Sequence, residues 1–350
     1  MIFGLCTFMQ NDPGGTRIEP ITEPCEQRPF WSVMIPVYQG VRYLPEALES
    51  VLVQDPGPKR MQIEVVDDCS PTADVRAIVE RVAPDRVSFF RQPRNVGLAR
   101  NWNTCIGRAR GHWVHILHQD DFVLRGFYQR LEEAVRCRDD VCSAFSRCFY
   151  MDEDGFWTGL TPLEMRSSGV LPNWLERIAG KNRTQCAAMA VRRSAYETIG
   201  GFRTDLKYTL DWEMWIRLAA NFKVWYEPRT LAAYRTHNGS TSAALQREIE
   251  DIPEIRRCAA MALSLVPPGN RSEVRRASAR WGASMALHVA DAKLRAGDHH
   301  LAVGYFREML RCSFSLWVGR RIPGFAFRFC KALFSKHARK GFPTPGKQSV

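Results

Sequence analysis

The sequence lacks several features that would place it quickly in a common class of protein. Its eleven cysteines are scattered and no two have Cys-x-x-Cys spacing, so a zinc site is not indicated and a reducing cytoplasm is the expected compartment. No apolar run reaches the roughly 18 residues of a membrane-spanning helix, and the apolar start, residues 1–9, lacks the basic segment of a signal peptide. No Gly-x-Gly-x-x-Gly follows the first predicted strand, which disfavours a dinucleotide-binding dehydrogenase.

Acidic residues are in the minority. Lysine and arginine number 49 against 37 aspartate and glutamate, which leaves a net charge of +12. A basic protein of this length favours an anionic partner, and a phosphorylated substrate, a membrane surface and a nucleic acid all remain open. The imbalance is greatest in residues 309–350, which hold nine basic residues, no acidic residue and interleaved aromatic side chains.

This basic aromatic segment has two interpretations. One is a tail that packs on the rest of the protein or is disordered. The other, which we favour, is a segment on an anionic membrane, where each basic residue contributes about 1 kcal/mol and aromatic rings lie at the interface. RNA binding fits the composition, but no stacking platform of known spacing is found, so we do not expect a nucleic acid partner. We expect a cytoplasmic protein held peripherally at the inner face of the cell membrane.

Apolar runs alternate with amphipathic stretches through the first third of the chain. The predicted strands cover residues 31–36, 61–66, 86–91 and 112–117, and the predicted helices cover 43–52, 73–82 and 97–110. Strands that alternate with helices of ten to fifteen residues indicate βαβ units. The sequence therefore predicts an α/β fold with a mostly parallel sheet flanked by helices.

The pattern changes twice further along the chain. Strands are predicted at 142–151, 186–192, 224–226 and 231–234, with a helix at 211–219, and after residue 245 helices are predicted at 252–264, 272–296 and 300–311. Proline and glycine interrupt the polar residues 10–30. We predict a flexible leader at 1–30, an α/β domain at 31–245, a helical subdomain at 246–312 and a basic aromatic tail at 313–350.

Pairs of carboxylates follow two of the predicted parallel strands. Asp67 and Asp68 follow one, and Asp120 and Asp121 follow another. Such a pair is more often a helix cap or a solvated turn than a metal site. Ligands of open α/β sheets, however, bind outside the carboxyl ends of the strands. Carboxylates there can share Mg²⁺ or Mn²⁺, and the cation can hold a phosphate and act as a Lewis acid on a departing diphosphate.

The same sheet edge offers groups for a nucleotide. Tyr38 ends the first strand, where its ring could stack on a base, and Pro36 can present only its carbonyl to a base edge. Asp68 could accept the imide N–H of a uracil-type base. Asp120 and Asp121 would close the site from the adjoining strand, one near the ribose and one on a metal that bridges the pyrophosphate. The simpler alternatives are that Tyr38 belongs to the core and that Asp68 caps a helix.

These segments resemble the motifs of family 2 glycosyltransferases, which have the GT-A fold. The similar segments are, in order, 32–38 with 43–52, 64–70, 94–103 with 111–121, 200–202 with 209–215, and 234–237 with 240–241. The resemblance covers about residues 31–242. It implies a Rossmann-like GT-A domain, here with a C-terminal helical extension. It also implies metal-dependent, inverting transfer of a hexosyl group from a nucleotide-diphosphate sugar to a hydroxyl of a glycan or lipid-linked acceptor in surface polysaccharide biosynthesis.

The resemblance also assigns roles to residues. Asp211 is implied as the general base that deprotonates the acceptor hydroxyl, and Asp121 with Asp120 as the ligands of Mn²⁺ or Mg²⁺. The residues implied on the nucleotide sugar are Pro36, Tyr38, Asp68, Asn95, Arg100, Asp120, Arg235 and His237. For Asp211 the alternative is a helix N-cap, and a position at a helix start would lower its pKa. Arg235 and His237 could neutralise the diphosphate, complete the metal shell or serve a structural role.

Two positions depart from the family pattern. The family often has a further Asp two residues before the Asp-Asp pair, where this chain has His118, and the glycine of its Asp-Asp-Gly-Ser turn is replaced by Cys69. A positive φ at Cys69 would cost about 1 kcal/mol. Two other functions stay open: a nucleotidyltransferase of the same fold, and a non-catalytic protein that binds RNA or another anion. The nucleotide base is left open, with a preference for uridine or thymidine.

Overall fold

The computed structural model describes residues 15–313 and 315–340. The chain divides into two compact units, Met1–Ser240 and Thr241–Val350, where the sequence predicted a boundary near residue 245. Residues 1–14 of the predicted leader and 341–350 of the predicted tail lie outside the described residues.

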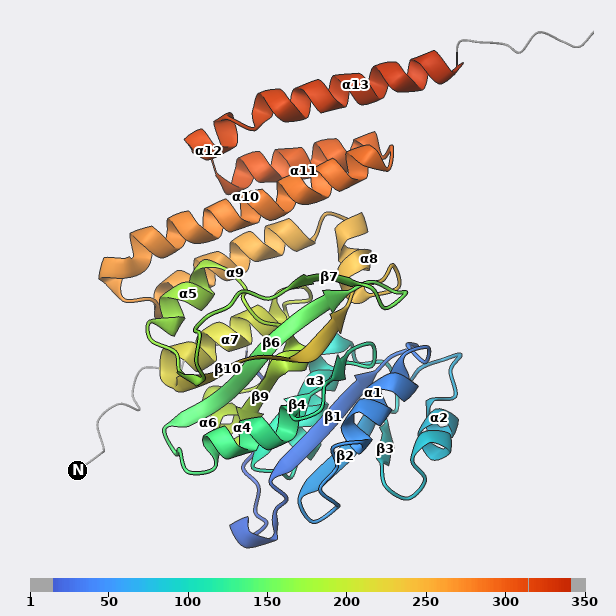
Figure 1. Cartoon of the computed structure of the whole chain (residues 1–350), viewed down its shortest axis with the longest axis vertical. Coiled ribbons are helices and arrows are strands. Elements are labelled where there is room, and N and C mark those ends of the chain that lie inside the picture. The colour runs from blue at the N-terminus through green and yellow to red at the C-terminus, as the bar shows by residue number, and fades with distance from the viewer. Residues whose placement is uncertain (1–14, 314, 341–350) are drawn as a thin grey trace, which may run out of the picture. The chain divides into compact units, whose positions relative to one another are not determined.

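The first unit is built on one mixed sheet (Figure 1). Its strands are β1 (Trp31–Val37), β2 (Met61–Asp67), β3 (Ser88–Arg91), β4 (Trp113–Ile116), β5 (Phe122–Val123), β6 (Val141–Met151), β7 (Trp157–Leu160), β8 (Gly169–Val170), β9 (Met189–Arg192) and β10 (Lys223–Arg235). The main order is β3-β2-β1-β4-β9-β6-β10-β5. The four strands β3, β2, β1 and β4 are parallel to one another, whereas β9 is antiparallel to both of its neighbours. The predicted α/β sheet is thus confirmed, with its parallel part in the first half of the unit.

Helices cover both faces of this sheet. The helices of the first unit are α1 (Leu44–Leu52), α2 (Val75–Val82), α3 (Leu98–Arg108), α4 (Phe127–Val135), α5 (Trp174–Gly180), α6 (Arg193–Ile199) and α7 (Leu210–Asn221), with short 3-10 turns at Cys25–Gln27 and Cys186–Ala188. Every residue of β1 is buried, as expected for a parallel strand covered on both faces. This double burial explains why the strand is apolar at every position except Ser32.

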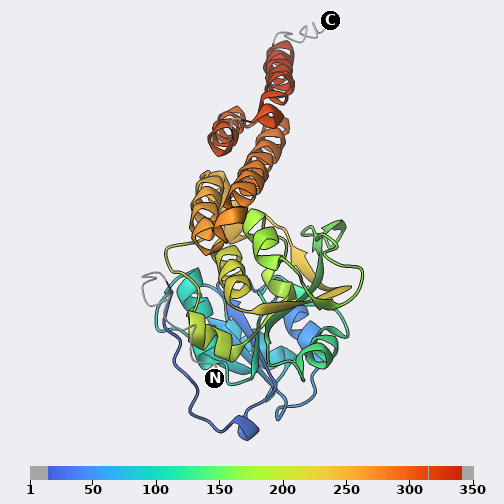
Figure 2. The ribbon, with the colours of Figure 1, turned by 90° about the vertical axis from the view of Figure 1, so that its left-hand side faces the viewer.

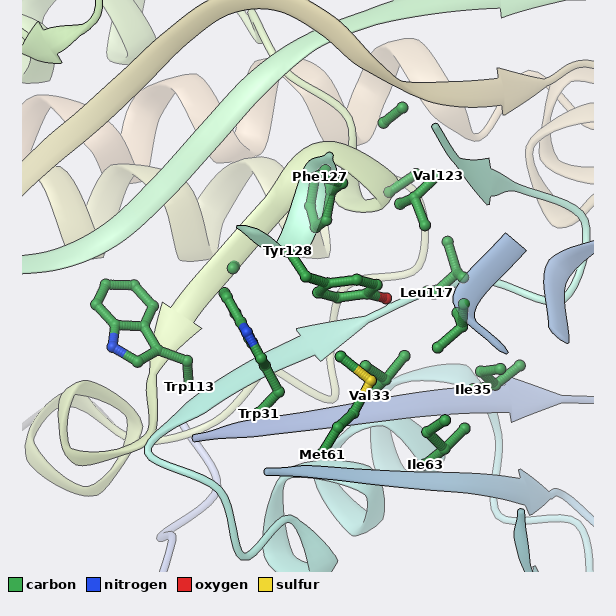
Figure 3. Packing of buried hydrophobic residues seen from close by; sticks show 14 of the residues in the cluster. Trp31, Val33, Ile35, Met61, Ile63, Trp113, Leu117, Val123, Phe127 and Tyr128 are labelled. Carbon is green, nitrogen blue, oxygen red and sulfur yellow. The ribbon is translucent and has the colours of Figure 1, made fainter. Parts of the chain in front are cut away.

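The main core lies between the sheet and the helices α1, α2 and α4 (Figure 3). Alternate residues of β1 point into it because successive side chains of a strand face opposite sides. Helix α1 contributes one apolar stripe at helical spacing. The buried residues of that stripe are Leu44, Ala47, Leu48 and Val51.

Strand β10 differs from the prediction. Two short strands were predicted at 224–226 and 231–234, but a single strand runs over Lys223–Arg235 and pairs with β6 along its length. The register shifts between Glu227 and Thr230, and the interval contains Pro228. A proline cannot donate a ladder hydrogen bond, so the strand bulges there and continues.

Residues 15–30, from the stretch predicted as a flexible leader, contact the rest of the first unit. Ile18 is buried. The carbonyl of Thr16 accepts a hydrogen bond from the amide of Gly201 at 2.7 Å, and its hydroxyl accepts one from the Asn103 side chain at 2.9 Å. This part of the segment is therefore held by the same asparagine that bonds to the backbone of Phe202.

The second unit is helical. It comprises α8 (Thr241–Arg247), α9 (Asp251–Leu265), α10 (Arg271–Arg295), α11 (His299–Cys312), α12 (Leu316–Gly319) and α13 (Ile322–Lys340). Helices α10 and α11 form a hairpin and lie side by side (Figure 2). Phe325 of α13 stacks on Phe306 with ring centroids 4.3 Å apart. Among the described residues, no helix combines the length and apolar character needed to cross a bilayer.

Candidate active site

The carboxyl ends of β1, β2 and β4 meet at one edge of the sheet, because β1 pairs in parallel with both of the other strands. The side chain of Gln119 joins two of these ends: its amide oxygen accepts from the Tyr38 amide at 3.0 Å and its amide nitrogen donates to the Tyr38 carbonyl at 3.3 Å. The Tyr38 side chain itself is 45% exposed. The ring is therefore available to stack on a base, and the alternative that it belongs to the core is wrong.

Pro36 lies in the middle of the sheet, where a proline is unusual. It pairs with Val66 of β2, whereas pairing with β4 ends at Met34 and Ile116. The amide of Leu117 bonds to the Met34 carbonyl, so Pro36, two residues further, faces the side where β4 has ended. Its missing N–H therefore costs no ladder hydrogen bond.

A tight turn follows β2. Asp67 accepts hydrogen bonds from the amide and hydroxyl of Ser70 at 3.1 and 2.5 Å and forms an ion pair with Arg91 at 2.6 Å. Cys69, between them, has φ of 58°. The replacement of the family's glycine by cysteine thus places a side chain in the left-handed region, as the sequence suggested.

Asp68 is buried beside the start of α3. Its two carboxylate oxygens accept from the amides of Val96 and Gly97 at 2.7 and 2.9 Å. These amides belong to the loop before α3, so Asp68 fixes this loop, and neither α2 nor α3 is capped by it. Burial raises the pKa of Asp68 above its usual range, against the effect of these two hydrogen bonds. Asn95 and Arg100 flank this point and are both exposed.

Asp120 and Asp121 follow β4 and are brought together with His118. One ligand atom from each of the three residues lies within 4.8 Å of the others. The carboxylate oxygen Oδ2 of Asp121 is buried without a hydrogen-bond partner, and His118 Nδ1 lies 3.5 Å from it. Burial, together with the neighbouring Asp120, raises the pKa of Asp121 to about 6. Two carboxylates and an imidazole that converge on one buried point fit a divalent cation.

The charges around this group are unequal. Burial opposes ionisation of Asp120, but the hydrogen bond from His237 at 2.9 Å and the nearby His118 hold its pKa below the usual range. Burial also opposes a charge on His118, whereas the Cys186 sulfur and Asp121 raise the pKa of the imidazole well above its usual range. The surroundings of Asp120 therefore favour its ionised form.

Arg235 braces the two acidic residues from β10. Its amide donates to Asp121 Oδ1 at 2.9 Å and its Nε to the Asp120 carbonyl at 3.1 Å. The guanidinium is buried, forms an ion pair with Glu46 at 2.5 Å and lies 4.2 Å from the ring centroid of Tyr43. The structure therefore supports the structural role among the alternatives for Arg235. Glu46 and Tyr43 of α1 were missed because their segment reads as an ordinary amphipathic helix.

Asp211 stands in the first turn of α7. One carboxylate oxygen accepts from the amide of Trp212 at 2.6 Å, and the Asn182 side chain bonds to the same carboxylate. The side chain is partly accessible but densely surrounded, and burial raises its pKa to about 6. The expectation that a helix start would lower this pKa was wrong, because desolvation outweighs the helix dipole. A carboxylate of this pKa is half protonated near pH 6 and ionised above it.

A hydrogen-bonded tyrosine lies near this carboxylate. The Tyr150 hydroxyl accepts from the Gln185 side chain at 3.1 Å. Burial raises the pKa of Tyr150, and the negative charge of Asp211 contributes in the same direction. Tyr150 follows an apolar strand pattern and Gln185 lies in a loop, so only the fold brings them together.

The sequence also matches a known protein family. The family model described as glycosyl transferase family 2 matches residues 32–207. The chain belongs to this family. A family 2 protein with these motifs is a glycosyltransferase, and the predicted family and activity are confirmed.

Individual relatives and a solved structure are also similar to this chain. An uncharacterized protein of Mycobacterium tuberculosis (strain CDC 1551 / Oshkosh) is 30% identical over 270 residues, which are 73% of this chain and 81% of the relative. The succinoglycan biosynthesis protein ExoO of Rhizobium meliloti is 33% identical over 110 residues, which are 30% and 31% of the two chains. The crystal structure of Staphylococcus aureus TarS 1-349 in complex with UDP-GlcNAc matches with a TM-score of 0.58 at 15% identity, over 90% of this chain and 93% of TarS. The GT-A fold of this family 2 enzyme is thereby confirmed.

Proposed function

We propose that this glycosyltransferase is metal-dependent and inverting, and that it moves a hexosyl group from a nucleotide-diphosphate sugar to a hydroxyl of a glycan or lipid-linked acceptor in surface polysaccharide biosynthesis. The observation that carries the proposal is a carboxyl of raised pKa, Asp211, within electrostatic reach of His118, whose ligand atom converges with those of Asp120 and Asp121. The similarity to a succinoglycan biosynthesis protein and to a structure solved with UDP-GlcNAc supports it.

The donor would lie across the carboxyl ends of β1 and β2. The exposed ring of Tyr38 can stack on the base. Asp68 follows the neighbouring strand, and two backbone amides hold its carboxylate in place. The remaining lone pairs of this carboxylate can accept the imide N–H of uracil or thymine. Exposed Asn95 and Arg100 can reach the polar parts of the donor from the adjoining loop and helix.

Mn²⁺ or Mg²⁺ would be held by Asp120 and Asp121, with His118 beside them. When bound, the cation would neutralise the charge of the departing diphosphate. The chain's own contribution is to hold the carboxylates in place. The Arg235 amide donates to the Asp121 carboxylate, and the Arg235 side chain donates to the Asp120 carbonyl. His237 holds the Asp120 carboxylate through a hydrogen bond.

Asp211 would act as the general base. Its carboxylate takes the proton of the acceptor hydroxyl while that oxygen forms a bond to the anomeric carbon and the bond to the diphosphate oxygen breaks on the opposite face. One displacement of this kind inverts the anomeric centre. Asn182 and the Trp212 amide hold the carboxylate in position. A pKa of about 6 leaves it ionised at neutral pH and basic enough to accept the proton.

The acceptor would be a saccharide that contacts the β6–β7 hairpin. Trp157 is 66% exposed, yet one face of its ring is stacked on Phe149 with centroids 4.4 Å apart, so the other face is presented rigidly. Exposed Phe156 lies beside it, and the preceding turn, 152–154, is acidic. An aromatic face stacks on the apolar side of a sugar ring, whereas an acidic turn repels a lipid phosphate. Trp157→Ala should abolish glycan-array binding and keep UDP affinity, with Leu163→Ala as the exposed control.

We also propose that the second unit lies at the anionic inner face of the cell membrane. Leu316 is 85% exposed and Phe327 is 71% exposed, among basic residues of a segment without acidic ones. Aromatic and basic groups together suit an anionic lipid surface. Because basic residues are attracted to anionic lipids, the protein should sediment with vesicles that contain about 30 mol% phosphatidylglycerol. With vesicles of pure phosphatidylcholine it should stay in solution. Equal behaviour with both vesicles would contradict the membrane contact.

The experiment that tests the enzymatic proposal is calorimetric titration of UDP, dTDP and GDP with and without Mn²⁺. Wild type should bind one nucleotide in a metal-dependent way, Asp121→Ala should lose that binding, and Asp211→Asn should keep it while losing transfer. Polyanion binding without any nucleotide binding would favour the non-catalytic alternative. A nucleotidyltransferase would instead release pyrophosphate and would not depend on Asp211.

A further inference from the structure

His118 occupies the position where the family often has an acidic residue. Its ring is held in place by Trp102 of α3, with ring centroids 4.5 Å apart and planes inclined by 30°. The side chain is only 20% exposed, and it lies on the loop that carries Asp120 and Asp121. A histidine fixed by stacking cannot swing away from the two carboxylates without losing this contact.

Two buried polar atoms in this group have no partner. They are Asp121 Oδ2 and His118 Nε2, and the other ring nitrogen of His118 lies 3.5 Å from Asp121 Oδ2 without hydrogen-bond geometry. Buried polar atoms are rarely left without a partner in a folded protein. A cation placed among His118, Asp120 and Asp121, whose ligand atoms lie within 4.8 Å of one another, would satisfy the unpaired carboxylate oxygen.

We propose that His118 is a nitrogen ligand of the catalytic cation and that it makes the site select Mn²⁺ over Mg²⁺. The inference rests on the metal dependence proposed above and specifies its ligand set. Mg²⁺ favours an all-oxygen shell and gives up water reluctantly, whereas first-row transition metals accept imidazole readily. Replacement of a carboxylate by an imidazole therefore weakens Mg²⁺ binding more than Mn²⁺ binding. It also makes the ligand set less negative.

A different role for His118 makes a different prediction. As an imidazolium it would supply the positive charge itself, in place of a metal, and nucleotide diphosphate would bind without any cation. In that case Mn²⁺ would compete with the proton on His118 and would not improve nucleotide affinity. The two roles are separated by measuring metal binding directly.

The test uses the full-length protein with Mn²⁺ or Mg²⁺ as the only added ligand, and then with UDP. Wild type, His118→Ala and His118→Asp are compared by calorimetry and by the loss of the free Mn²⁺ signal in electron paramagnetic resonance. His300→Ala, which alters an exposed histidine of the second unit, is the matched control. Circular dichroism confirms that each variant is folded.

We expect wild type to bind Mn²⁺ at least about tenfold more tightly than Mg²⁺. His118→Ala should weaken Mn²⁺ binding by about tenfold or more, and His118→Asp should bring the two affinities together by strengthening Mg²⁺ binding. Pulsed resonance of bound Mn²⁺ should show coupling to an imidazole nitrogen in wild type and in His300→Ala, and none in His118→Asp. A merely structural histidine would not produce this coupling.

Three results would overturn the inference: equal affinities for the two metals in wild type, unchanged Mn²⁺ affinity in His118→Ala, or no nitrogen coupling. Failure of the proposed transferase activity is distinguishable from these, because metal binding and its nitrogen signal are measured without substrate. A protein that shows them but transfers no sugar would keep the ligand assignment and lose the proposed reaction.

Discussion

Asp211→Asn should abolish sugar transfer and at the same time stabilise the protein. The pKa of this carboxyl is about 6 in the folded state, against an ordinary value of 3.8. A carboxyl whose pKa is raised by folding lowers the free energy of unfolding as pH rises from about 4 to 6, and the full penalty persists above pH 6. A shift of this size corresponds to at most roughly 3 kcal/mol, and partial exposure reduces it to about 2 kcal/mol. Asparagine removes the charge and can still accept from the Trp212 amide.

The assay is thermal unfolding of the first unit in EDTA at pH 8 and pH 4.5. A gain of about 2 kcal/mol corresponds to roughly 4–8 °C in Tm for a unit of this size, and most of it should vanish at pH 4.5, where wild-type Asp211 is largely protonated. Asp139→Asn is the matched control, because the side chain of Asp139 is fully exposed. An unchanged or lower Tm for Asp211→Asn at pH 8, or retained transfer, would refute the reasoning.

Four further outcomes follow from the same contacts. With saturating Mn²⁺, kcat should fall about tenfold per pH unit below pH 6 as Asp211 becomes protonated, which a pH–rate profile checks. Arg235→Met should lower the free energy of unfolding by about 2 kcal/mol in urea titrations, because it removes the buried guanidinium that bonds to the Asp120 carbonyl and to Glu46. Cys69→Gly should raise it by about 1 kcal/mol by relieving a φ of 58°. Removal of divalent cations by EDTA should abolish turnover, and added Mn²⁺ should restore it.

Much of the fold could be predicted because its signals are local. The strand β1 is apolar except at Ser32 because both of its faces are buried, and the stripe in α1 repeats at helical spacing. Asp67, Asp68, Asp120 and Asp121 follow strand ends, and parallel strands carry their ends to one edge. The strand β10 was divided in two because Pro228 reads as a break, whereas pairing with β6 resumes beyond it.

The roles of individual site residues were less accessible. Arg235 reads as a cation for a diphosphate, but its partner is Glu46, far away in sequence on α1. His118 reads as the loss of a ligand until its ring is seen beside Asp121. Tyr150 and Gln185 carry no motif, and their hydrogen bond depends on how β6 and the loop before β9 pack.

The sequence by itself determined the family, the alternation of strands with helices and the placement of the carboxylates, because periodicity and strand ends are properties of neighbouring residues. Only the tertiary structure decided the raised pKa of Asp211 and the convergence of His118 with Asp120 and Asp121. The pKa of Asp211 depends on how densely distant segments surround it, and the unpaired oxygen of Asp121 exists only because the fold buries it. Desolvation is a property of packing, and it cannot be read from residues that are adjacent along the chain.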